Sequence, residues 1–273
     1  MSSKRTLLVA LALAVTVLCA ACSNGGSTAS AQSDTAALYD PQALPSGPLG
    51  DQIREGHDII VDTQTRMKGY VRAQMSCAAC HIAAGTKPRG GSFVGTYAYF
   101  PQWNKRSHRV IALQDRLAEC FLYSMNGRPP AYSSKEMIAM VAYIAWLSRN
   151  VPTLSTPSPQ QGFITPLPTS SADVKHGAAL YAEKCAACHQ ANGEGVAGTF
   201  PPLWGPKSFN SGAGMAHIDR MTGFVMYNMP QNAPGTLSLR DAYDISAYVL
   251  TRERPKFQQD RTVAFPSKEA GYF

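Results

Sequence analysis

The sequence predicts a mainly α-helical protein in which two small domains follow one another, joined by a proline-rich linker. The first observation behind this prediction is a repeated pentapeptide, CAACH, at 77–81 and again at 185–189. The second is that each copy is followed by a segment with a serine at its start and apolar residues at helical spacing, at 133–147 and 238–250. Units that repeat the same features in the same order indicate an internal duplication.

The division of the 273 residues into segments follows the composition. The tract 152–171 is rich in Pro, Ser and Thr and poor in charge, which is typical of an extended linker. We therefore expect an export signal at 1–22, a flexible tether at 23–50, a first domain at 51–151, the linker at 152–171, a second domain at 172–256 and a C-terminal tail at 257–273.

The N-terminal leader has the pattern of an export signal. A basic pair at 4–5 precedes an apolar run at 7–18 that is too short to span a bilayer comfortably. Two cleavage alternatives remain open. The sequence AAC at 20–22 resembles a lipoprotein box, which would leave a lipid anchor at Cys22, whereas ASA at 29–31 fits ordinary signal peptidase. Either route predicts a periplasmic protein, anchored to the membrane in the first case.

The formal net charge of +7 gives little information about partners. The basic residues form no run with interleaved aromatic residues, so we expect no nucleic-acid partner.

The two CAACH copies are attachment signatures for covalently bound haem. Two cysteines three apart on a helical turn reach the two vinyl groups of the porphyrin, and the adjacent histidine binds the iron. A zinc site or a redox-active cysteine pair is the alternative, but a histidine directly after each copy in an exported chain disfavours it. The sequence thus predicts two haem c groups, attached through Cys77, Cys80, Cys185 and Cys188, with His81 and His189 as iron ligands.

The sixth iron ligand of the second domain is expected to be Met229. It lies in the sequence Asn-Met-Pro ahead of the last helix, which resembles the methionine loop of class I cytochromes c. Met226 is expected to pack in the core. Histidine–methionine ligation raises the reduction potential of haem iron, so this haem should accept electrons readily and pass them on.

Two residues are candidates for the sixth iron ligand of the first domain. Alignment of the final helices of the two repeats places Met229 opposite Ser124, one residue from Met125. On that basis Met125 is the ligand, and the protein is a dihaem electron carrier without a substrate. Cys120 would then be a buried small apolar residue, as free cysteines often are.

The helical pattern around Cys120 favours a different role. In HRVIALQDRLAECFLYSM, Arg116, Cys120 and Ser124 are four residues apart and form a stripe beside an apolar one. Arg109 falls on roughly the same face. A guanidinium, a thiol and a hydroxyl in one line are unusual in a core, and they suit an anion site beside a thiolate that binds iron.

The stretch FVGTYAYFPQWNKRSHRVIALQDRLAECFLYSMNGRPP resembles the thiosulfate dehydrogenase family, whose members are dihaem c-type cytochromes. The resemblance extends over roughly residues 51–255. It implies that Cys120 is the distal ligand of the His81 haem and that Arg106, Arg116 and Ser124 bind substrate. Some members have a lysine beside the second-haem methionine that competes as a ligand; here the neighbour is Asn228, which implies no such exchange.

The function implied by this resemblance is the oxidation of two thiosulfates to tetrathionate, or the reverse reaction as a tetrathionate reductase. Electrons would leave through the second haem to a periplasmic c-type cytochrome or a similar small carrier. Cys120 would either tune the first haem as a spectator thiolate or leave the iron and be sulfurated itself. The alternative function is a dihaem electron carrier without a substrate, in which Met125 and Met229 are the sixth iron ligands.

Overall fold

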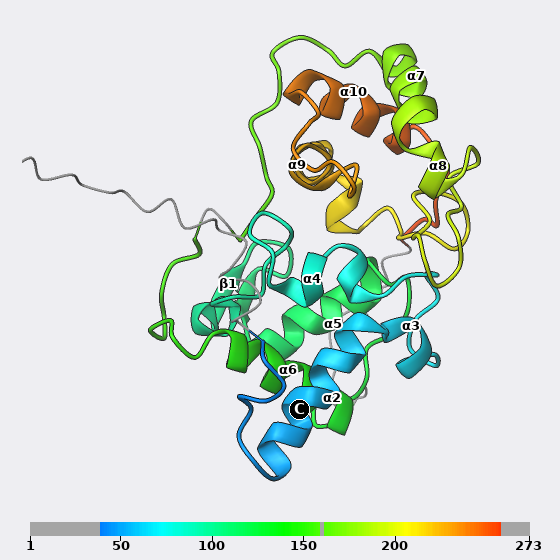
Figure 1. Cartoon of the computed structure of the whole chain (residues 1–273). Helices are drawn as coiled ribbons and strands as arrows, with labels where there is room; N and C mark the ends of the chain where they lie inside the picture. Colours follow the sequence, from blue (N-terminus) through cyan, green and yellow to red (C-terminus); the bar gives the residue numbers. More distant parts are fainter. Residues whose placement is uncertain (1–38, 159–160, 258–273) are drawn as a thin grey trace, which may run out of the picture.

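The computed structural model describes residues 39–158 and 161–257, which form two helical units that lie one above the other (Figure 1). The export signal, the lipoprotein box with Cys22, and nearly all of the C-terminal tail lie outside the described residues. Within the described ranges, no helix has the length and apolar character needed to cross a membrane.

The first unit contains five helices, a short hairpin and two 3-10 turns within the described ranges. They are α2 (Pro48–Val61), α3 (Thr63–Arg66), η1 (Cys77–Ala79), α4 (Ile82–Gly85), η2 (Thr96–Tyr99), β1 (Gln102–Asn104), β2 (Arg109–Ile111), α5 (Leu113–Tyr123) and α6 (Lys135–Leu147). The described part of the second unit has an isolated β-bridge between Val196 and Phe200 and otherwise contains helices: α7 (Val174–Lys184), α8 (Ala186–His189), η3 (Gly214–Ala216), α9 (Ile218–Asn228) and α10 (Leu239–Leu250).

Helices α2 and α6 form the main contact of the first unit, and they cross at a glycine. A β-carbon on Gly56 would lie 2.0 Å from the carbonyl oxygen of Ala139 and 2.8 Å from the β-carbon of Tyr143. Only glycine lets the two backbones approach this closely. Helix α6 begins at a serine as predicted, because the Ser134 side chain accepts a hydrogen bond from the backbone N–H of Met137.

The second unit repeats this arrangement with α7 and α10. A β-carbon on Gly177 would lie 2.0 Å from the carbonyl oxygen of Asp244, and Ser238 caps α10 by accepting from the N–H of Asp241. The final helices end at Leu147 and Leu250, where the sequence predicts them to end. The predicted tandem of two similar helical domains is therefore confirmed.

We expect Gly56→Ala to lower the free energy of unfolding by about 3 kcal/mol, because the added methyl group forces α2 and α6 apart. Gly69→Ala is the matched control, since a β-carbon there would meet nothing within 4 Å. Denaturant unfolding of both haem-loaded variants measures the difference. Equal stability of the two variants would contradict a close helix crossing at Gly56.

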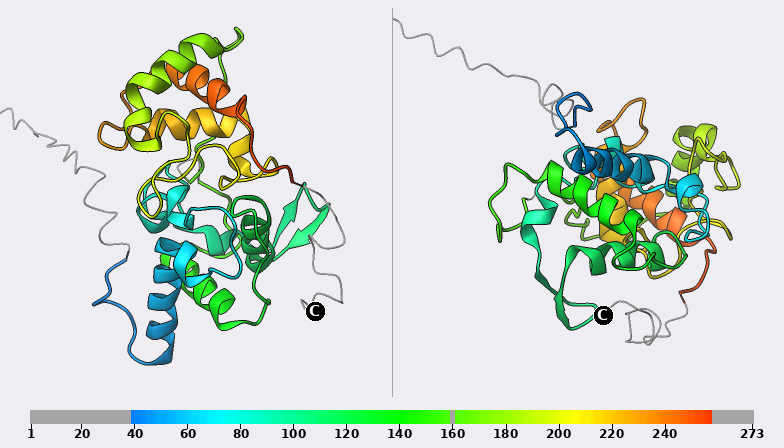
Figure 2. Two further views of the ribbon diagram at one scale, coloured as in Figure 1. Left: turned by 90° about the vertical axis from the view of Figure 1, so that its right-hand side faces the viewer. Right: turned by 90° about the horizontal axis from the view of Figure 1, so that it is seen from below.

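The segment before α5 differs from the sequence-based expectation. Residues 102–111 form an antiparallel hairpin that projects from the first unit, and α5 begins only at Leu113 (Figure 2). The predicted position of Arg109 on the stripe of α5 is therefore wrong. Arg109 lies on β2 and donates to Asp115 at 2.8 Å. Asp115 also accepts from the N–H of Ala112 at 2.9 Å, which fixes the start of the helix.

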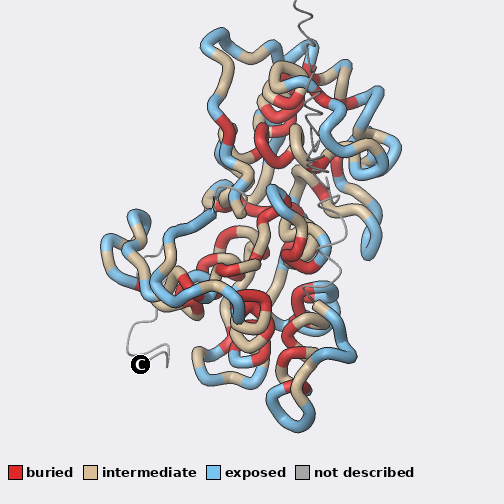
Figure 3. Tube along the Cα trace, turned by 60° about the vertical axis from the view of Figure 1, so that its left-hand side comes forward, coloured by how far each residue is buried: buried red, intermediate tan, exposed pale blue. Residues whose placement is uncertain are grey.

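The two units share a hydrophobic cluster at their junction. Met75, Tyr123 and Met125 of the first unit pack in it with Tyr181 and Phe209 of the second. Figure 3 shows buried segments in both units. The linker is also in contact with the second unit, because a β-carbon on Gly223 of α9 would clash with the carbonyl oxygen of Phe163. The relative position of the units is thus fixed by packing.

Candidate active site

The first CAACH motif lies on η1 and the turn that follows it. The hydroxyl of Thr63 contacts the Cys77 sulfur at 3.1 Å and accepts from the Cys77 N–H at 3.0 Å. The Nδ1 atom of His81 lies 2.6 Å from the carbonyl oxygen of Gly91. Because a carbonyl only accepts, Nδ1 carries the proton, which leaves Nε2 as the metal-binding nitrogen. Burial lowers the pKa of His81 to about 4, so the ring is neutral.

The second motif has the same construction. His189 ends α8, and its Nδ1 lies 2.9 Å from the carbonyl oxygen of Pro201. Burial lowers the pKa of His189 as well. Each domain therefore presents two free thiols and one neutral imidazole whose orientation is set by a backbone carbonyl.

This donor set fits haem c and does not fit zinc. Within residues 39–158 and 161–257, no three His, Cys, Asp or Glu side chains lie together as a metal site would require. Two thiols and a single neutral imidazole are what covalent attachment of a porphyrin and proximal ligation of its iron need.

The two candidate ligands in α5 and the turn after it have different surroundings. Met125 is 3% exposed and packs in the cluster shared by the two units. Its carbonyl oxygen accepts from the N–H groups of Arg72 and Ala73, which fixes the local backbone. Cys120 is only half-buried. The pKa of Cys77 is raised to about 12, chiefly by burial and in smaller part by Cys120, which places Cys120 close to the first motif. The packing thus favours Cys120 over Met125 as the distal group.

Arg116 lies directly against Cys120. Its Nη1 atom is 3.2 Å from the Cys120 sulfur and 3.6 Å from Glu119 Oε2. The arginine side chain is 47% exposed, whereas the Glu119 side chain is only 5% exposed. The pKa of Arg116 is raised, chiefly by Cys120 and also by Glu119. This contact places a permanent positive charge beside a thiol, a setting that suits an anionic ligand.

The other two predicted substrate residues are both next to Tyr123, at the end of α5: Ser124 in the sequence and Arg106 in contact with its ring. Ser124 is the C-cap residue one turn beyond Cys120, and it is half-buried. The Arg106 guanidinium lies over the Tyr123 ring at 3.9 Å and donates to the carbonyl oxygen of Gly212 at 3.0 Å. Arg116 and Cys120 are therefore in contact, while Arg106 extends from the hairpin to the second unit.

Two residues at the site were missed by sequence reasoning. Glu119 is a buried carboxylate that holds Arg116 and accepts from Asn104 at 3.0 Å. Its spacing of three from Arg116 on a helix could have indicated the pair. Tyr123 is buried and supports Arg106, but the two are far apart in sequence, so no local signal connects them.

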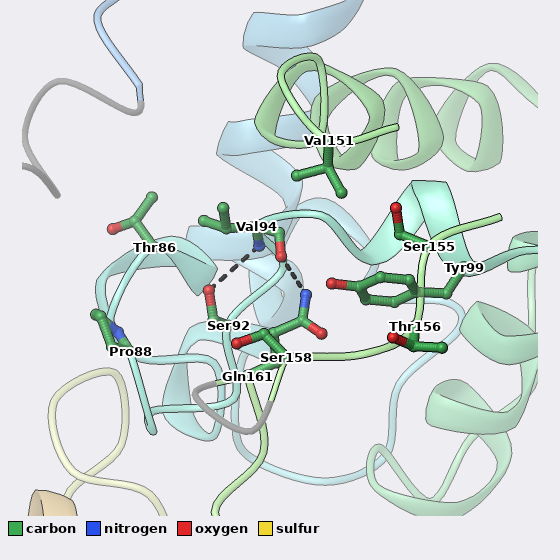
Figure 4. Close-up of a pocket in the computed structure, with 10 residues that line it drawn as sticks. All are labelled: Thr86, Pro88, Ser92, Val94, Tyr99, Val151, Ser155, Thr156, Ser158 and Gln161. Atoms are coloured by element: carbon green, nitrogen blue, oxygen red, sulfur yellow. Dashed lines mark hydrogen bonds between the residues drawn. The ribbon is translucent and has the colours of Figure 1, made fainter. Parts of the chain in front are cut away.

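A cavity of about 610 Å³ lies elsewhere, between the loop after the first motif and the linker. Figure 4 shows its lining, which includes Ser92, Tyr99, Ser158 and Gln161, with Gln161 donating to the carbonyl oxygen of Val94. The lining contains no charged side chain, so this cavity does not provide the charge that a small dianion requires.

The fold and the two histidine-bearing motifs define a c-type cytochrome with two tandem domains. The family model described as SoxA/TsdA, cytochrome c domain, matches residues 67–153, and the model for cytochrome c matches residues 174–253. The chain is 39% identical to a thiosulfate dehydrogenase of Allochromatium vinosum, covering 82% of this chain and 87% of that one. A thiosulfate dehydrogenase of Stutzerimonas stutzeri is 38% identical, with 78% and 71% covered. The chain therefore belongs to the thiosulfate dehydrogenase family and is an oxidoreductase.

A solved structure supports the same assignment. The thiosulfate dehydrogenase TsdBA of Marichromatium purpuratum superposes with a TM-score of 0.76 at 35% identity and covers 80% of this chain. The match spans 50% of that longer chain.

Proposed function

We propose that this protein oxidises two thiosulfate ions to one tetrathionate ion at Cys120, and that it can run the reaction in reverse as a tetrathionate reductase. The observation that carries the proposal is the Arg116 guanidinium, 3.2 Å from the Cys120 sulfur and close to the first haem motif. A soft nucleophile beside a permanent positive charge suits an anionic sulfur substrate.

Repulsion between the two substrates is the main obstacle. Two dianions roughly 4 Å apart repel each other by about 4 kcal/mol in water, because each carries two charges. Arg106 and Arg116 bind the sulfonate ends, since a planar guanidinium matches such oxygens with two hydrogen bonds. Ser124 donates a further hydrogen bond. Held together, the reactants avoid the cost of a bimolecular encounter.

Cys120 acts covalently in this proposal. Its thiolate bonds to the outer sulfur of the first thiosulfate, two electrons leave, and a cysteine S-thiosulfonate remains. The second thiosulfate attacks that outer sulfur, which forms the new S–S bond of tetrathionate and releases the Cys120 thiolate. Atoms and charge balance, because two electrons are lost for each tetrathionate formed.

Two haem c groups complete the protein in this proposal, and they supply one-electron redox chemistry when bound. Cys77, Cys80 and His81 would hold the first, with Cys120 as its other ligand only while the thiolate is not bonded to substrate; Cys185, Cys188, His189 and Met229 would hold the second. A periplasmic c-type cytochrome or a similar carrier would take up the electrons. The location follows from the leader, with a lipid anchor if Cys22 is modified.

The test uses the oxidised haem-loaded protein with thiosulfate and excess ferricyanide. We expect ferricyanide to be consumed and tetrathionate to form in a ratio of two electrons per tetrathionate. Tetrathionate with a reduced dye tests the reverse direction. Absence of turnover, with both haems still reducible by dithionite, would leave a dihaem electron carrier instead.

A further inference from the structure

Asn228 is a buried amide at the end of α9, directly before Met229. It is 1% exposed. Its Nδ2 atom donates to the carbonyl oxygen of Phe224 at 3.1 Å, which caps the helix end, and to the carbonyl oxygen of Arg89 at 2.9 Å. Phe224 belongs to the same helix, but Arg89 belongs to the other domain.

The loop that receives this bond is the one that orients the first histidine. Two residues beyond Arg89, the carbonyl oxygen of Gly91 lies 2.6 Å from Nδ1 of His81. The carbonyl oxygen of Gly90 accepts from the N–H of Ile82 at 2.8 Å, so the loop 87–91 is tied to the first motif. The loop also contacts α9 through the Arg89 guanidinium, which lies over the Tyr227 ring at 4.5 Å.

The Asn228 amide lies close against the loop 87–91, and its hydrogen bonds allow only one of its two flip states. A β-carbon on Gly90 would lie 3.3 Å from Asn228 Oδ1. Oδ1 is buried, and no described residue forms a hydrogen bond with it. A flipped amide would place that oxygen against two carbonyl oxygens, so the donors alone determine the orientation. A buried amide that leaves its acceptor unused is retained at a cost, which indicates that its two donor bonds matter.

We propose that Asn228 is a positioning residue that fastens the Met229 loop to the loop holding His81, so that the first domain stabilises the distal ligand of the second haem. This inference rests on the ligation in the proposed function. The N–H of Met229 donates to the carbonyl oxygen of Val225 at 2.9 Å, so the methionine leaves the helix within one residue of the fastened amide. Movement of Met229 away from the haem would disturb the one hydrogen bond that Asn228 makes across the domain junction, to the carbonyl oxygen of Arg89.

The main test is Asn228→Leu in the haem-loaded protein, which keeps the branched shape of the side chain, with a larger volume, and removes both donors. We expect the charge-transfer band of methionine-ligated ferric haem to weaken and the affinity for imidazole to rise about tenfold, equivalent to about 1.4 kcal/mol. The reduction potential of the second haem should fall. Asn232→Ala is the matched control, because Asn232 is exposed a few residues further along the same loop.

A second variant changes only the first domain. The methyl group of Gly90→Ala would lie 3.3 Å from Asn228 Oδ1, and 3.1 and 3.2 Å from the β-carbons of Ile82 and Lys87. We expect it to raise the imidazole affinity of the second haem by two- to fivefold, although the mutated residue belongs to the other unit. The inference would be overturned if the charge-transfer band, the imidazole affinity and the reduction potential of the second haem in both variants matched those of Asn232→Ala. It would also be overturned if the wild type showed no methionine charge-transfer band. None of these readouts uses thiosulfate, so failure of the proposed turnover gives a separate result.

Discussion

Replacement of Cys120 by serine should reduce thiosulfate oxidation about a thousandfold or more, with haem content and fold unchanged. The hydroxyl is nearly the same size as the thiol, but it is a far weaker nucleophile towards sulfur and a poor ligand for haem iron. Arg116, which lies 3.2 Å from the sulfur, would keep its place through Glu119. The measurement is the rate of ferricyanide reduction with tetrathionate assayed as product.

Met125→Leu is the control for this experiment, since Met125 is the ligand in the alternative of a simple electron carrier. Because the substitution nearly conserves volume in a packed cluster, we expect activity within about twofold of wild type. The spin-resonance spectrum of the first haem should show thiolate ligation in wild type and in Met125→Leu, and lose it in Cys120→Ser. The opposite pattern would make Met125 the ligand and leave Cys120 without a role in chemistry.

The sequence predicts those parts of the structure that depend on local pattern. The haem motifs and the capped helices that end each domain are readable because spacing and capping involve neighbouring residues. The close helix crossings at Gly56 and Gly177 cannot be predicted from local pattern, because the backbone that each glycine contacts lies far along the chain. The same is true of Asn228, whose partner Arg89 belongs to the other domain.

The hairpin before α5 shows how a local pattern misleads. The spacing of Arg109 and Arg116 fits a continuous helix face, yet Arg109 pairs with Asp115 and the chain turns at Leu113. The capping contact of Asp115 competes with helix continuation, and periodicity alone does not detect it. The consequence for the site is that Arg109 is neutralised by a buried carboxylate, whereas Arg106 at the hairpin turn reaches the end of α5.

Arg116→Met should lower kcat/KM for thiosulfate about ten- to a hundredfold, chiefly through KM. The variant loses the fixed charge at Cys120, and a charge-assisted hydrogen bond contributes about 1.5–3 kcal/mol. Arg116→Lys should recover part of the loss, because it restores the charge without the two-pronged geometry. Arg252→Met is the charge-matched control, since Arg252 is exposed and stacks over Tyr248 in the second unit.

Among the described residues, loss of Arg116 also leaves the buried Glu119 carboxylate with Asn104 as its single partner, which destabilises the fold independently of substrate binding. The double variant Arg116→Met/Glu119→Gln separates the two effects. We expect it to unfold at a higher denaturant concentration than Arg116→Met alone while its KM stays high. Recovery of kcat/KM in the double variant would show instead that Arg116 serves only to neutralise Glu119, and the anion site would then depend on Arg106 and Ser124.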